Sequence, residues 1–102
     1  MIELKVDFPV YPFGKESDDV EITVIMEGDH TEDEPSVIIE VQGNGVIPDG
    51  NYVFTSQQAI AMAINTGSLI GITNLDAIVR IGKEVTFMQI AYNSLRDMGN
   101  LM

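Results

Sequence analysis

The residues best suited to chemistry in this chain lie in one polar segment, residues 28–35, which reads Gly-Asp-His-Thr-Glu-Asp-Glu-Pro. Its carboxylates, at Asp29, Glu32, Asp33 and Glu34, are oxygen ligands of the kind that a hard cation such as Ca²⁺ prefers. The segment lacks the Asp-x-Asp-x-Asp-Gly spacing of an EF-hand loop, in which glycine makes the sharp turn between ligands. We therefore expect no metal site and no other cofactor.

The same segment contains His30, the single histidine of the chain. Neighbouring carboxylates favour the charged form of an imidazole, but acid–base catalysis would need a nucleophile or a second base beside it. Asp19 and Tyr52 are the other residues around which a small catalytic site could be built, and no sequence spacing pairs either with His30. The sequence therefore predicts a protein that is not an enzyme. A small enzyme of unknown chemistry is the third hypothesis.

The charge of the chain is concentrated in its first half. Residues 1–50 contain thirteen of the 16 acidic residues and two of the five basic ones, so the formal net charge of −11 lies entirely there. Such a charge excludes direct binding of nucleic acid, because a protein neutralises phosphates with Lys and Arg. The charge is compatible with two hypotheses about what the acidic residues bind. The acids could dock a basic protein patch, or they could imitate a DNA backbone and occupy the basic channel of a nucleic-acid enzyme.

Acidic residues of two kinds are candidates for binding a partner. Some occupy outward positions of expected strands, and others lie in the polar segment. The candidates are Glu21, Glu27, Asp29, Glu32, Asp33, Glu34 and Glu40. A solvated face that only keeps the protein soluble is the alternative reading.

The elements that must position these residues are strands in the first half of the chain. Apolar and polar residues alternate with period two over 2–8, 20–27 and 37–42, which is typical of half-buried strands. Turn residues separate these runs, including Pro9, Pro12 and Gly14 after the first. Short additional strand pieces are expected at 46–47 and 52–54.

Helical signals replace the alternation from Thr55 onward. The run Thr55-Ser56-Gln57-Gln58 fits a capping box, and helix formers follow to residue 64. Asn74 can cap a second helix that runs from Leu75 toward Ile81.

Residues 84–98 predict a third helix, whose wheel has an apolar arc. This arc contains Val85, Phe87, Met88, Ala91, Tyr92, Leu95 and Met98, whereas Ile90 falls among the polar residues. A hairpin around Gly82-Lys83 is the competing interpretation of 77–88.

The expected fold is α+β: an N-terminal antiparallel sheet of three to five strands with two or three C-terminal helices packed on one face. A short sheet needs helices to cover its apolar face, so residues 1–102 are expected to form a single domain. Its acidic, strand-rich half is 1–54 and its neutral, helix-rich half is 55–102. The chain has no cysteine and no apolar stretch long enough to cross a membrane. We expect a cytoplasmic location, or a virus particle.

The function that this pattern favours is a non-enzymatic protein–protein interaction or assembly protein, encoded by a phage or other mobile element. The expected partners are a protein with a basic surface and further copies of the same chain, with no membrane partner. Ile90, Leu101 and Met102 are the apolar residues expected to make a contact between copies. The alternative is an inhibitor that mimics DNA.

Overall fold

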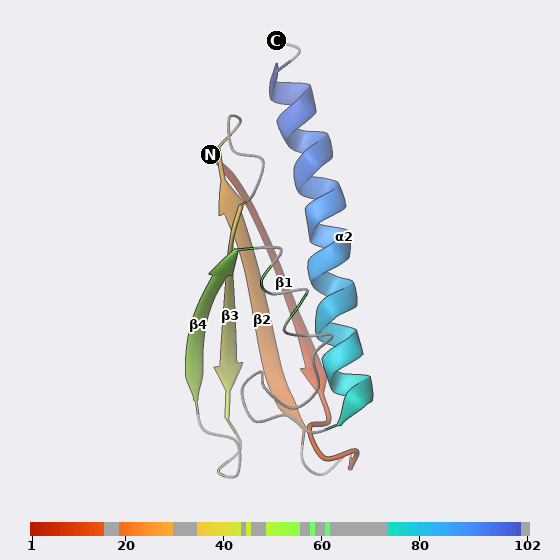
Figure 1. Ribbon diagram of the computed structural model, residues 1–102. Coiled ribbons are helices and arrows are strands. Elements are labelled where there is room, and N and C mark those ends of the chain that lie inside the picture. The colour runs from red at the N-terminus through yellow and green to blue at the C-terminus, as the bar shows by residue number, and fades with distance from the viewer. Residues whose placement is uncertain are drawn as a thin grey trace.

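The computed structural model describes residues 1–15, 19–29, 35–43, 45, 49–55, 58, 61 and 74–100. Four strands, β1 (Ile2–Val10), β2 (Val20–Gly28), β3 (Ser36–Gln42) and β4 (Gly50–Thr55), form an antiparallel sheet in the order β1-β2-β3-β4. One helix, α2 (Leu75–Asn100), follows them and lies along the β1 side of the sheet (Figure 1). The expected antiparallel sheet of three to five strands and the α+β class are therefore confirmed.

The apolar residues of the strands meet on the inner face of the sheet because the register aligns their periods. Val6 lies opposite Val24, Val24 opposite Ile39, and Ile39 opposite Tyr52. Val24 and Ile39, in the two central strands, are fully buried. Residues two apart in a strand share one face, so burial of this row explains the alternation seen in the sequence. The short piece expected at 52–54 lies within β4, and the piece at 46–47 lies outside the described residues.

Asn74 determines where α2 begins. Its main-chain carbonyl accepts bonds from Ala77 and Ile78, at 3.1 and 3.2 Å, and its side-chain Oδ1 accepts one from the N–H of Asp76 at 3.3 Å. Its Nδ2 donates to the carbonyl of Tyr11 at 2.7 Å. The predicted cap is therefore confirmed. It also attaches the start of α2 to the turn that follows β1.

The expected two or three C-terminal helices are not matched, because the described residues form a single C-terminal helix of 26 residues. The helices expected over 75–81 and 84–98 are continuous through Gly82, and the hairpin interpretation is wrong. Glycine in a helix interior costs about 1 kcal/mol but keeps its N–H. Two contacts bridge this site: Arg80 Nε donates to Glu84 Oε1 at 3.0 Å, and Thr86 Oγ1 donates to the Gly82 carbonyl at 2.8 Å.

The capping box at the end of β4 is confirmed. The N–H of Thr55 donates to Gln58 Oε1 at 3.1 Å, and the N–H of Gln58 donates to Thr55 Oγ1 at 3.2 Å. Gln58 and Ala61 are helical. The rest of the helix expected to follow them lies outside the described residues.

Only part of the predicted apolar arc of α2 is buried. The helix packs on β1 and β2. It buries Ala77, Ile78, Ile81, Val85, Met88 and Tyr92. Phe87, Ala91, Leu95 and Met98 were expected on the same arc but are exposed. The arc is therefore only partly buried, because two strands of a sheet cover a narrower stripe of a helix than the apolar residues of this one occupy.

Candidate functional site

The outer face of the sheet, opposite the face that packs on α2, consists of cross-strand rows. We define this outer face by the residues of β1 to β4 that alternate with the inner ones. Every one of them is exposed or half-buried. Three rows cross all four strands: Glu3–Glu27–Ser36–Thr55, then Lys5–Ile25–Ile38–Val53, then Asp7–Thr23–Glu40–Asn51. Glu21 lies in a fourth row, opposite Pro9 and Gln42.

The middle row is apolar on three of its four strands. Ile25 and Ile38 are half-buried, and Val53 at the β4 end is 68% exposed. Directly opposite side chains in an antiparallel pair have Cβ atoms about 4.5–5.5 Å apart. The three side chains therefore form a continuous apolar strip across β2, β3 and β4, and Lys5 extends the row onto β1.

Acidic residues border this strip on both sides. Glu3 and Glu27 lie opposite each other on one side. Asp7 and Glu40 belong to the row on the other side, where Thr23 Oγ1 donates to Asp7 Oδ1 at 2.6 Å. An apolar centre with a polar rim is the usual anatomy of a protein–protein contact surface. The outer face is therefore the candidate interaction surface of the described chain.

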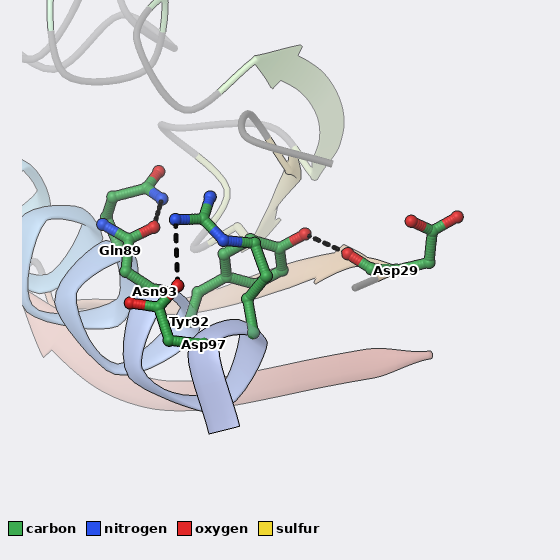
Figure 2. A network of polar contacts seen from close by, with 6 residues as sticks. Asp29, Gln89, Tyr92, Asn93 and Asp97 are labelled. Carbon is green, nitrogen blue, oxygen red and sulfur yellow. Dashed lines mark hydrogen bonds and ion pairs between the residues drawn. The ribbon is translucent and has the colours of Figure 1, made fainter. Parts of the chain in front are cut away.

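The structure brings together three of the predicted partner-binding residues. Glu21, Glu27 and Glu40 all lie on the outer face, together with Glu3 and Asp7. Asp29 instead follows the end of β2, and its main-chain carbonyl accepts a hydrogen bond of 2.9 Å from Tyr92 Oη (Figure 2). The other predicted residues of this segment, Glu32, Asp33 and Glu34, lie outside the described residues, as does His30.

Three apolar residues were predicted to make a contact between copies of the chain, and the structure describes one of them. Ile90 is 58% exposed on α2, whereas Leu101 and Met102 lie outside the described residues.

Polar side chains also line the last turns of α2 (Figure 2). Gln89 Nε2 donates to Asn93 Oδ1 at 2.9 Å, and Arg96 Nη2 lies 3.5 Å from Asp97 Oδ1. Both are contacts within one helix, and the Gln89–Asn93 pair, four residues apart, is of the kind that contributes a few tenths of a kcal/mol. They stabilise α2 and contain no arrangement of a base beside a nucleophile.

One hollow among the described residues is small for a ligand site. A hollow of about 170 Å³ lies between the end of β1 and the start of α2, lined by residues that include Pro9, Tyr11, Asn74, Asp76 and Arg80. Ligand pockets usually measure about 300–1,000 Å³. No group of three or more His, Cys, Asp or Glu side chains in the described part of the chain could hold a metal ion. No helix described here is long and apolar enough to cross a membrane.

The apolar strip was not predicted from the sequence, although each of its residues alternates with the core residues of its strand. Ile25 and Ile38 occupy positions that alternate with the core of β2 and β3, so each reads as an isolated apolar residue on a polar face. Their alignment depends on the register that pairs Ile25 with Ile38 and Ile38 with Val53. A β-branched residue at the outward position of each of three successive strands was the available signal.

No protein-family model matches the chain, and no curated protein or solved structure matches it either.

The crowding of carboxylates predicts a stability that depends on salt. We expect the melting temperature to rise with ionic strength, because salt screens the repulsion within a chain of net charge −11. Glu3 and Glu27 lie directly opposite each other, and like charges in such a pair destabilise a sheet. Glu27→Gln should therefore melt at a higher temperature than the wild type in low salt, and the difference should shrink in high salt. A melting curve that is insensitive to salt would contradict the repulsion.

Proposed function

We propose that this protein is a non-enzymatic interaction protein whose outer sheet face docks on a partner protein. The partner surface would carry an apolar strip flanked by Lys and Arg side chains. The single observation that supports this most is the row Ile25–Ile38–Val53, which is bordered by Glu3 and Glu27 on one side and by Asp7 and Glu40 on the other.

The two parts of this surface would contribute in different ways. Burying Val53 and the exposed parts of Ile25 and Ile38 would supply affinity at about 25 cal/mol per Å² of apolar surface removed from water. The carboxylates would increase the rate of encounter and select a basic partner, because electrostatic complementarity acts mainly on association rate and specificity. A partner without basic residues would face several uncompensated carboxylates, so the flanking rows also exclude wrong partners.

A mimic of the DNA backbone is the second candidate, favoured by the regular spacing of carboxylates on strands of one sheet. The middle row argues against it. Imitation of a continuous phosphate backbone would place carboxylates where Ile25, Ile38 and Val53 lie. The apolar strip fits a protein surface better than it fits a channel that evolved to bind phosphates.

The test is a comparison of variants in capture of a partner from the cells that produce the protein. The wild type should retain a basic protein in low salt and release it as salt rises. Val53→Asp and Glu40→Lys should each reduce the retained amount at least tenfold. Asp76→Lys is the matched control, because Asp76 is an exposed acid in the first turn of α2, away from the outer face.

Three results would count against this function. They are retention of the same protein by all variants, loss of retention in Asp76→Lys as well, and capture of no basic protein at all. Adding duplex DNA separates the two candidates. Competition by DNA would favour the mimic, and a captured protein that does not bind DNA would favour docking on an ordinary protein surface.

A further inference from the structure

The free edge of the sheet at β1 is a second surface, which adjoins the outer face at Lys5 and Asp7. Within the described ranges, β1 pairs with β2 alone and lies at the end of the strand order. The main-chain N–H and C=O groups along one side of such a strand are available to another strand, so proteins usually shorten, charge or block their edge strands. β1 is nine residues long, and Pro9 is its only residue without an N–H. Its first seven residues therefore form an unblocked edge.

The apolar core is incomplete along this same edge. Leu4 and Val6 point to the inner face but are only half-buried, whereas the β2 residues opposite them, Met26 and Val24, are fully buried. The other inner-facing residues of β1, Ile2, Phe8 and Val10, are buried. The guanidinium carbon of Arg80 lies 4.9 Å from the centroid of the Phe8 ring and helps to cover it. This contact places the side of α2 that carries Arg80 against β1, the strand with the free edge.

Further apolar residues project from that side of α2. Phe87, Ala91 and Met98 follow Arg80 at spacings of seven, eleven and eighteen residues, which are close to whole turns of a helix with 3.6 residues per turn. Phe87 is 64% exposed and Met98 is 61% exposed. We call these three residues, with Leu4, Val6 and the edge of β1, the edge surface.

We propose that the edge surface binds a second copy of the chain. The two β1 strands would pair antiparallel about a twofold axis at Val6, and the two sheets would become one sheet of eight strands. Such an interface is self-complementary, as a twofold dimer requires. The two α2 helices would lie on the same face of the joined sheet, near the axis, where Phe87 of each would be removed from water.

The charges of β1 favour a second copy of the chain as the binding partner of the edge surface. They also favour Val6 as the residue on the twofold axis. In this register Lys5 lies opposite Asp7 of the second copy, and the symmetry makes two such pairs. Centring on Lys5 would place two lysines opposite each other, and centring on Asp7 would place two aspartates together. Centring on Leu4 would match Glu3 with Lys5, but it pairs only Ile2–Val6 of the nine-residue strand. Cross-strand pairs of opposite charge stabilise a sheet, and like pairs destabilise it.

The net charge gives this dimer an unusual dependence on salt. Each copy carries a formal charge of −11, so the two copies repel one another in low salt. Screening should therefore strengthen self-association. Docking of the outer face on a basic partner should weaken under the same change. The dimer and the proposed function thus respond to salt in opposite directions, and either can fail without the other.

Cysteine cross-linking tests the register directly, because the chain contains no cysteine of its own. Val6→Cys should form a disulfide-linked dimer on mild oxidation at moderate salt, since the two Cβ atoms would lie about 4.5–5.5 Å apart. Val53→Cys is the control. Val53, at 68% exposure, is more accessible than Val6 and would react more if links formed by random collision. Faster linking of Val53→Cys, or no link at Val6, would overturn the proposal. Preferential linking of Leu4→Cys would overturn the Val6 register.

Charge reversal tests the pairing between copies, with mass measured by sedimentation equilibrium. Lys5→Glu and Asp7→Lys should each weaken self-association at least tenfold, and an equimolar mixture of the two should recover it. Lys15→Glu and Asp19→Lys carry the same changes in net charge at exposed positions outside β1, so they should behave as the wild type does. A wild type that stays monomeric in high salt, or a mixture that does not associate, would contradict the dimer.

The helical part of the contact has its own matched pair of variants. Phe87→Asp should weaken self-association at least tenfold. Ile90→Asp, at a similarly exposed residue of the same helix, should weaken it clearly less, since Ile90 lies about 60° around the helix from Phe87 and farther from the line through Arg80 and Met98. The opposite ranking would place the contact at the residue that the sequence favoured and would overturn the edge surface.

Discussion

Replacement of Tyr92 by alanine is expected to lower the free energy of unfolding by about 3–5 kcal/mol. The side chain is fully buried, and it lies in the second half of α2, where the helix packs against the sheet. A domain of this size is usually stable by only about 5–15 kcal/mol. The variant should therefore unfold at a much lower urea concentration, and its melting temperature should fall by more than 10 °C, at about 4–8 °C per kcal/mol.

Tyr92→Phe separates the ring from the hydroxyl. It keeps the buried ring and removes the hydroxyl, which donates a hydrogen bond of 2.9 Å to the Asp29 carbonyl. One such bond contributes about 0.5–1.5 kcal/mol net, so most of the stability should remain. If Tyr92→Ala cost no more than Tyr92→Phe, the second half of α2 would not be packed on the sheet in solution.

Ile39→Ala is the second large expected effect, a loss of about 2–5 kcal/mol. Ile39 is fully buried at the centre of the inner face, between Val24 on β2 and Tyr52 on β4. Removing three carbons there leaves a cavity that a close-packed interior fills only partly. Urea unfolding monitored by circular dichroism would measure the change.

Ile38→Ala provides the matched control. It is the same substitution on the next residue of β3, but Ile38 points to the outer face and is half-buried. Half of the usual burial energy of an isoleucine is about 1 kcal/mol, so this variant should be much closer to the wild type. Equal losses at the two positions would mean that the outer face is as enclosed as the core. They would contradict its use as a docking surface.

The two surfaces proposed here divide the molecule between two kinds of partner. The outer face has an apolar row between carboxylates, which suits a basic protein surface. The edge surface adds Phe87 and Met98 of α2 to the free side of β1, and its Lys5 and Asp7 suit a second copy. Pairing at β1 would leave the outer face of each copy open and would extend it across eight strands. A dimer could therefore present two docking faces to a partner at once.

The strands and the helix starts were predictable because the contacts that define them are local. Period-two alternation identified β1, β2 and β3, since neighbouring residues of a strand point to opposite faces. Asn74 was recognisable as a cap, and Thr55 and Gln58 as a capping box, because each of these interactions spans a few residues. Continuity of α2 through Gly82 was not predictable in this way. It depends on burial of Ile78, Ile81 and Val85 against the sheet, which outweighs the poor helix propensity of glycine.

By itself, the sequence predicted an antiparallel sheet and a cap at Asn74, and it placed the negative charge in the strand-rich half of the chain. Only the tertiary structure decided which apolar residues remain outside. The register of β2, β3 and β4 aligned Ile25, Ile38 and Val53 into one strip, and the narrow contact of α2 with β1 and β2 left Phe87 and Met98 exposed. The physical reason is the same in both cases. Alternation and helical periodicity are properties of one segment, whereas register and the buried side of a helix are set by contacts between segments that are distant in the chain.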